Sequence, residues 1–416
     1  MSSNCFCGQL IRYSENSKCE AEKQAKKKAK QERKISQRIH QLALNLMTEF
    51  LTFPSAPNSI YTTRDINACL LQLSLTEGYA QGELANLQLK FNMPRWVPTG
   101  HTFRNRIQNL NRDQVQAAFT FANDEILKIL KGCGIFKRYA IVAIDYTHDP
   151  FYGDINAPMV IGGKQDRGTC WGYQYASIHI VEAGRRLTLY TMSIDQFTEK
   201  ADAVATLLEK AKERGVHVKL VLLDRGFFSA EVINLLKKLG VHFVMPAVKY
   251  ETVKQAIAAN HNSTAACVVR FNLGQGEKAA RFNLAVYPVP IERLKGRSKR
   301  KKELSLHDLY FAFATNLPIS VAESVSYIPQ EYRRRWGIET GYRVMGMVKA
   351  KTTSKNYVLR LTYRLAAVFL YNMWQYGNFL LCRVLGQSFL KPVFALKRLA
   401  AYFEGFIIGG LGPPRG

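Results

Sequence analysis

Cysteine is scarce in this sequence, with eight residues among 416. The cysteines are scattered and lack the density of a disulfide scaffold, so we expect a reducing cytoplasm. The N-terminus has no apolar stretch suited to a signal peptide, which argues against secretion. Long apolar runs are also missing, because even the most apolar segment, residues 365–381, contains Asn372, Gln375 and Asn378. That segment favours a buried core helix, and no membrane partner is expected.

Acidic residues are few as well. There are 32 Asp and Glu residues against 58 Lys and Arg, which gives a formal net charge of +26. Such an excess is typical of proteins that bind polyanions. Hydrophobic residues make up 47% of the chain, which supplies a packed core and excludes wholesale disorder. From the length we expect about two or three domains.

The first 135 residues are basic at the start and helical in pattern. Residues 1–40 contain the run AEKQAKKKAKQERK, which favours a helix but has almost no apolar face. This basic arm either contacts phosphates or is a solvated tail. Residues 41–135 space their apolar side chains at helical intervals between proline and glycine breaks. They predict an all-helical domain, either a helix-turn-helix that binds DNA ends or a plain bundle.

Residues 136–250 change to alternating strands and helices. The predicted strands are 139–144, 174–181, 187–194, 217–223 and 241–248, and the predicted helices are 201–214 and 229–239. The first and fourth strands each end on an acid, Asp145 and Asp224. This order matches a ribonuclease-H-like α/β fold, in which those two strand ends are neighbours in a mixed sheet flanked by helices. One such acid alone is weak evidence, because Asp is also common in turns and helix caps.

Residues 251–315 interrupt the alternation with a β-rich insertion. Strand-like runs cover 265–271, 280–287 and 309–315, and the loop before the last run is strongly basic. Its cationic residues are Arg293, Lys295, Arg297, Lys299, Arg300, Lys301 and Lys302. So many like charges in one loop favour phosphate contact over a plain mobile loop. We expect residues 316–385 to complete the α/β core that begins at residue 136, and residues 386–416 to form a C-terminal tail.

Residues 332–348 have helical character. At about 100° per residue, Tyr332, Arg335, Glu339 and Arg343 share one helix face. A glutamate so placed is commonly just an ion-pair partner of the arginines. Magnesium sites, however, are built from carboxylates, and phosphoryl transfer between DNA strands uses such metal ions.

Three short motifs occur in this order: Asp145-Tyr146-Thr147, Asp224-Arg225-Gly226-Phe227 and Tyr332-x2-Arg335-x3-Glu339. As a set they resemble the DDE transposases of prokaryotic insertion sequences, in the group with a Tyr-x2-Arg-x3-Glu-x6-Lys signature, over roughly residues 136–375. The resemblance implies a ribonuclease-H-like core, cut-and-paste DNA movement and two Mg²⁺ ions, for which Mn²⁺ can substitute. It implies that Asp145, Asp224 and Glu339 are the catalytic metal ligands and that Tyr332 and Arg335 contact DNA phosphate.

The chain departs from this signature at Gly346, where the group has lysine. Arg343 or Lys349 could take over the phosphate contact, with Lys351 also nearby, although helical geometry puts Lys349 away from the Glu339 face.

Other candidate residues compete with this set. Asp195, which ends a predicted strand, is the most credible alternative ligand, whereas Asp149 and Asp154 are expected in a turn. Glu331 is expected at a helix start, and Trp336 in the core rather than stacked on a base.

The sequence therefore predicts a transposase that cuts DNA at transposon ends and transfers the strands into target DNA. The expected DNA contacts are Tyr332, Arg335, Arg343, Arg297, Lys299, Arg300 and Lys301. Expected partners are double-stranded DNA, as terminal inverted repeats and target, and a second copy on the paired ends. We expect a prokaryotic cytoplasmic protein associated with the nucleoid through DNA. The alternatives are a nuclease of the same fold without strand transfer and an inactive, transposase-derived DNA-binding protein.

Overall fold

The structure is a computed structural model and describes residues 4–90, 97–136, 139–261, 266–290, 305–319 and 327–407. The chain divides into two compact units. The first unit draws on residues within 1–122, 347–353 and 358–416, and the second on residues within 123–346 and 354–357. The loop residues Arg293, Lys295, Arg297, Lys299, Arg300, Lys301 and Lys302 lie outside the described residues.

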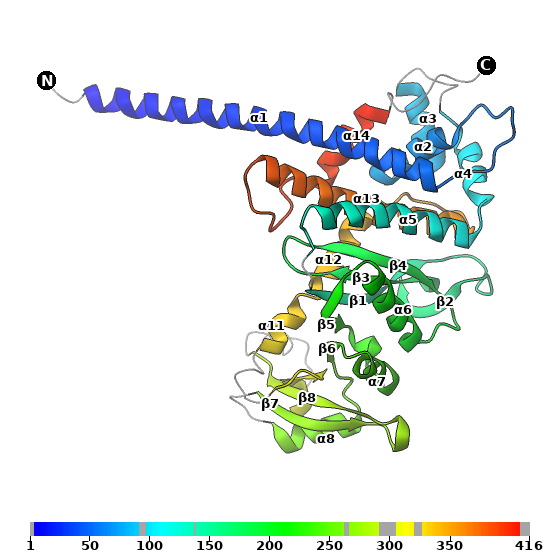
Figure 1. Ribbon diagram of the computed structural model, residues 1–416, viewed down its shortest axis with the longest axis vertical. Coiled ribbons are helices and arrows are strands. Elements are labelled where there is room, and N and C mark those ends of the chain that lie inside the picture. The colour runs from blue at the N-terminus through cyan, green and yellow to red at the C-terminus, as the bar shows by residue number, and fades with distance from the viewer. Residues whose placement is uncertain are drawn as a thin grey trace. The chain divides into compact units, whose positions relative to one another are not determined.

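The first unit is helical, in agreement with the helical pattern of the N-terminal sequence (Figure 1). Its helices are α1 (Asn4–Phe50), α2 (Thr63–Thr76), α3 (Ala80–Lys90), α4 (Gly100–Gln108), part of α5 (Arg112–Gly132), most of α13 (Tyr357–Val384) and α14 (Leu396–Ile407). The side chain of Asn67 donates to the backbone oxygens of Met47 and Leu51 at 3.0 and 2.9 Å, which ties α2 to the end of α1. Thr62 and Asp65 form a capping box that begins α2.

The units differ from the predicted domain boundaries. A single helix, α1, continues through residue 40, so the basic arm is not a separate element. Most of α13, which we assigned to the catalytic core, belongs to the first unit. The reason is close packing: Gly377 lets α13 approach Ile39 of α1, where a Cβ would collide. The segment called a tail contains α14, whose Phe403 ring packs 4.9 Å from the ring of His40.

Helix α13 contains the most apolar segment of the sequence, and its polar side chains are buried. The Asn378 amide donates to the backbone oxygen of Trp374, and its oxygen accepts from the amides of Val393 and Phe394. The prediction of a buried core helix is therefore confirmed. Among the helices in the described part of the chain, none combines the length and apolar character needed to cross a membrane.

The second unit is built on one mixed sheet, which has nine strands among the described residues (Figure 1). They are β1 (Tyr139–Pro150), β2 (Val160–Asp166), β3 (Thr169–Ile180), β4 (Leu187–Ile194), β5 (His217–Leu223), β6 (His242–Pro246), β7 (Cys267–Leu273), β8 (Ala280–Pro288) and β9 (Tyr310–Thr315). The order is β2-β3-β1-β5-β6-β9-β8-β7, and β4 also pairs with β3. Among these strands, only β1–β5 and β5–β6 pair in parallel. The ribonuclease-H-like mixed sheet flanked by helices is thus confirmed, with β1 and β5 as neighbours.

Helices cover the two faces of this sheet. Ile328 of α11 (Tyr327–Arg333) and Ile338 of α12 (Trp336–Gly346) pack in one core cluster with Ile141 and Ala143 of β1 and with β5, β6, β8 and β9 residues. Because side chains alternate along a strand, Val142 and Ile144 face the other side. Helices α6 (Lys200–Glu213) and α7 (Ala230–Lys238) contact the sheet there.

Several local predictions are corrected. Strand β1 does not end at Asp145 but continues to Pro150, because residues 145–150 pair with β3; Asp149 therefore lies in a strand and not in a turn. The insertion strands β7, β8 and β9 extend the central sheet through the β6–β9 pair. The insertion begins with helix α8 (Glu251–Asn260). The predicted helix over 332–348 is divided, because α11 ends at Arg333 and α12 begins at Trp336.

Candidate active site

Asp145 is presented by the central strand β1. Alternation places it on the same side as Ile141 and Ala143, which pack against α12. The last β1–β5 pair is Ile144 with Leu223, so no parallel partner follows at Asp145. Its backbone oxygen accepts the Tyr342 hydroxyl of α12 at 2.8 Å. This bond joins the strand of Asp145 to the helix that carries Glu339.

Asp224 directly follows the neighbouring strand β5. Leu220 and Leu222 belong to the cluster under α12, so alternation carries Asp224 to the same side of the sheet as Asp145. Asp224 begins the short 3₁₀ turn Arg225–Phe227, but its side chain makes no capping hydrogen bond there. Asp224 therefore does not act as a helix cap, which was the alternative role for an aspartate at a strand end.

Glu339 lies in the first turn of α12, and Arg335 connects it to β1. Arg335 Nη2 lies 2.5 Å from Glu339 Oε1, and Arg335 Nη1 lies 3.1 Å from Asp145 Oδ2. The guanidinium is 5.5 Å from the centre of the Tyr332 ring. The Arg335 side chain is only 10% exposed, whereas Glu339 is 51% exposed. Arg335 thus bridges two of the three predicted acids from a largely buried position.

The electrostatics place Asp224 in the same group. Burial, with the nearby negative charges of Asp224 and Glu339, raises the pKa of Asp145 to about 6, although Arg335 and the Tyr146 amide oppose this rise. Burial raises the pKa of Tyr332, and the charges of Asp224 and Asp145 add to the effect. Burial lowers the pKa of Arg335, but Tyr332 and the three acids outweigh it and the net shift is upward. All three acids therefore act on one guanidinium.

The donor chemistry of this cluster suits a hard divalent cation, since all three acids offer carboxylate oxygens. The Arg335 guanidinium is the cation that the carboxylates surround here. Within the described ranges, however, no three His, Cys, Asp or Glu side chains converge closely enough to hold a metal ion. The acids are the right ligands, but the arrangement shown is the one in which arginine supplies the positive charge.

The competing acids have other partners. Asp195 Oδ1 accepts from the Thr198 hydroxyl at 2.6 Å and from the Phe197 amide at 3.1 Å, so it organises the turn after β4. Asp154 accepts from the Asn156 amide at 2.9 Å, as expected for a turn residue. Glu331 is buried and pairs with Arg334 at 3.0 Å. None of these contacts involves Asp145, Asp224 or Glu339.

The remaining signature residues are on or near α12. Tyr332 is half-buried beside Arg335, and Arg343 is exposed one turn beyond Glu339. Gly346 ends α12, and a Cβ there would meet nothing within 4 Å. Lys349 and Lys351 belong to the first unit.

A cavity of about 630 Å³ adjoins Asp224 and was not predicted from the sequence. Asp224, Arg225, Tyr332, Arg333 and Trp336 are among its lining residues. Trp336 is 62% exposed, so the prediction of core packing for this side chain is wrong. It starts α12 at the rim while Ile338, two residues later, enters the core. The motif Asp224-Arg225 was the signal in the sequence that could have located the cavity.

Comparisons with known proteins agree with this fold. A family model described as "Transposase DDE domain" matches residues 137–373. Among solved structures, the piggyBac transposase synaptic complex with hairpin DNA is similar with a TM-score of 0.54, at 12% identity over 91% of this chain and 80% of that one. The Drosophila P element transposase strand transfer complex gives a TM-score of 0.27, at 9% identity over 85% of this chain and 92% of that one. No curated protein sequence matches.

Proposed function

The chain belongs to the DDE transposase family, and on that premise we propose that it cuts DNA at transposon ends and joins the freed ends to target DNA. One observation carries the proposal: Arg335 bridges Asp145 and Glu339, and Asp224 follows β5, the strand that pairs with the strand of Asp145. Three acids so placed are costly to keep together without a cation, and in the structure Arg335 supplies it. We propose that metal ions join Arg335 in this role in the working enzyme.

Asp145, Asp224 and Glu339 would hold two Mg²⁺ ions, or Mn²⁺, and these ions would activate the attacking oxygen and neutralise the leaving oxygen. Asp145 would be the shared ligand, because Arg335 joins it to Glu339 and its strand pairs with β5, which ends directly before Asp224. Arg335 and Tyr332 contact the phosphate next to the cut. The Tyr342 hydroxyl holds α12 against β1, so that Glu339 keeps its place relative to Asp145. Water or a DNA 3′-hydroxyl is the nucleophile, and no covalent enzyme intermediate is needed.

The rest of the chain is proposed to bind DNA. The N-terminal helices recognise terminal inverted repeats, and the loop with Arg297, Lys299, Arg300 and Lys301 contacts flanking DNA, as does Arg343. Because the net charge is +26, binding is expected to weaken steeply with salt. We propose a homodimer on the paired ends and association with the prokaryotic nucleoid through DNA.

The experiment is an end-cleavage and joining assay on duplexes from the two flanks of the gene, with Mg²⁺ or Mn²⁺. We expect 3′-end cleavage followed by joining, and loss of both in Asp224→Asn. The control is Asp154→Asn, which removes an exposed turn carboxylate of the same unit and should stay active. Cleavage without joining would favour the nuclease alternative, and binding without cleavage in either metal would favour the inactive DNA-binding protein.

A further inference from the structure

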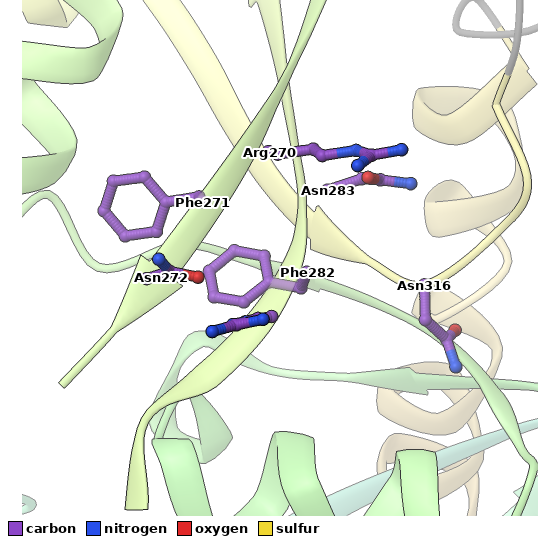
Figure 2. Close-up of a pocket in the computed structure, with 7 residues that line it drawn as sticks. Arg270, Phe271, Asn272, Phe282, Asn283 and Asn316 are labelled. Atoms are coloured by element: carbon purple, nitrogen blue, oxygen red, sulfur yellow. The ribbon is translucent and has the colours of Figure 1, made fainter. Parts of the chain in front are cut away.

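The hairpin of β7 and β8 has two different sides. Arg270 pairs with Asn283 and Asn272 with Arg281, so one side of the hairpin carries only arginine and asparagine at these positions. The intervening pair, Phe271 with Phe282, faces the other side, where the two rings lie 5.5 Å apart. Figure 2 shows Arg270 and Asn283 pointing to one side and Phe271 to the other.

The phenylalanine side anchors the hairpin. Phe282 is buried, and its ring meets that of Phe228 at 5.8 Å. The polar side is held by amides: Asn283 donates to the Leu317 backbone oxygen at 3.0 Å, and Asn316 accepts from the Phe243 amide at 3.0 Å. The arginine side is therefore presented on a fixed base.

The arginine side is cationic and borders a cavity. Its residues border a cavity of about 490 Å³, and no acid is among the lining residues: Arg270, Phe271, Asn272, Arg281, Phe282, Asn283 and Asn316. Arg270, Asn272 and Arg281 are exposed, and within the described part of the chain neither arginine forms an ion pair. Exposed Lys237 of α7, from the other side of the sheet, donates its Nζ to the Arg281 backbone oxygen at 3.0 Å and helps to hold the start of β8.

We propose that this arginine–asparagine face, made of Arg270, Asn272, Arg281 and Asn283, binds a DNA phosphate backbone. The inference rests on the proposed function and adds a second DNA contact, separate from the acids. Arginine and asparagine are typical donors to phosphate and sugar oxygens, and guanidinium groups match phosphate in a bidentate manner. Arg270 and Arg281 are diagonal cross-strand neighbours, with Cα atoms about 7–8 Å apart, so they can contact neighbouring phosphates.

The face lies on the same side of the sheet as the acids. Ala285 and Tyr287 share the core cluster with Ala143 and Leu222. Because side chains alternate along a strand, Asn283 and Arg281 of β8 face the same side as Ala285. In the same way, Asp145 of β1 faces the same side as Ala143. Exposed Arg333 of α11, which also lines the cavity beside Asp224, adds positive charge on this side.

The same register separates the arginine–asparagine face from Asp224. Strand β8 runs parallel to β5 through the antiparallel pairs with β9 and β6, and the register puts Arg281 level with Leu220 of β5 and Ala285 level with Asp224. Four residues of strand and three strand spacings give a separation of roughly 20 Å. One turn of B-DNA is about 34 Å, so the contact falls roughly 6 base pairs from the cut.

The test compares the full chain with Arg270→Ala/Arg281→Ala on a duplex from the gene flank, in chelator, by fluorescence anisotropy and hydroxyl-radical footprinting. We expect affinity to fall about tenfold at 0.1 M salt and the slope of log K against log salt to fall by about 2. Protection should disappear roughly 6 base pairs from the cut and persist at the cut itself. Arg270→Lys/Arg281→Lys should retain the salt slope.

The control is Lys212→Ala/Lys219→Ala, which removes two exposed cations from α6 and β5. An equal loss in this control, no loss in the arginine variant, or a uniform loss of protection would each overturn the proposal. The binding test is run in chelator, which prevents metal-dependent cleavage. Its outcome for the arginine–asparagine face is therefore independent of whether the protein cleaves and joins DNA. If the wild-type chain shows the protection that depends on Arg270 and Arg281 but never cleaves DNA, the proposed function is wrong and the DNA contact of this face is still supported.

Discussion

Replacing Asp145 by asparagine should stabilise the metal-free protein at high pH. Burial and the neighbouring acids raise the pKa of Asp145 to about 6, above the ordinary value of 3.8. The folded state therefore holds this proton more tightly than the unfolded state does. The contribution of Asp145 to the free energy of unfolding is therefore highest below about pH 4, falls as the pH rises toward 6, and stays constant above that. The asparagine side chain of the variant cannot ionise, so the variant avoids this loss.

The magnitude follows from the shift in pKa. About 2 pKa units correspond to roughly 3 kcal/mol at 1.36 kcal/mol per unit. The side chain is only 16% exposed, so solvent screening reduces this figure little. For a unit of this size, each kcal/mol shifts the melting temperature by about 2–4 °C. Asp145→Asn should therefore melt about 5 °C or more above wild type at pH 8, and at the same temperature near pH 4.

The assay is thermal unfolding in chelator between pH 4 and pH 8, with Asp154→Asn as the exposed control. A stability difference between Asp145→Asn and wild type that does not change with pH would refute the reasoning. So would a variant that is less stable than wild type at pH 8.

Three further outcomes are expected. Tyr342→Phe removes the bond to the Asp145 backbone oxygen and should cost about 0.5–1.5 kcal/mol in unfolding free energy and about tenfold in cleavage rate, measured on matched duplexes. Arg335→Gln removes the internal cation, so we expect the DNA-free protein to bind Mn²⁺ roughly fivefold more tightly in titration calorimetry, while DNA affinity falls. Gly346→Lys meets open space, and it should leave the melting temperature unchanged or higher and strengthen DNA binding by about threefold in anisotropy; an unchanged Kd would show that residue 346 lies away from the DNA.

Local patterns predicted most of the second unit. The continuous apolar runs of β1 and β5 and the glycine stop after α6 are signals read within one element, whereas the neighbouring positions of β1 and β5 were predicted from the order of strands and helices. The length of β1 was missed because it is set by β3: residues 145–150 remain extended only through that pairing. The separation of α11 from α12 was likewise missed, since a short turn at Arg335 keeps Arg335 beside Glu339.

The contact between Arg335 and Asp145 joins residues 190 positions apart, so no spacing rule could show it. Helical geometry predicted the Arg335–Glu339 pair correctly but not that the guanidinium would occupy the centre of the acid cluster. Trp336 was assigned to the core because large aromatic side chains are usually buried. Its position at the start of α12, beside the cavity, depends on tertiary packing.

The most direct test of the central claim is the metal dependence of Asp145→Cys. A thiolate binds Mg²⁺ poorly and softer ions such as Mn²⁺ better. If Asp145 binds a catalytic cation, the variant should fail to cleave transposon-end DNA in Mg²⁺ and regain cleavage in Mn²⁺, while Asp154→Cys cleaves in both. Cleavage by Asp145→Cys at the wild-type rate in Mg²⁺ alone would contradict a metal-binding role for Asp145 and the function built on it.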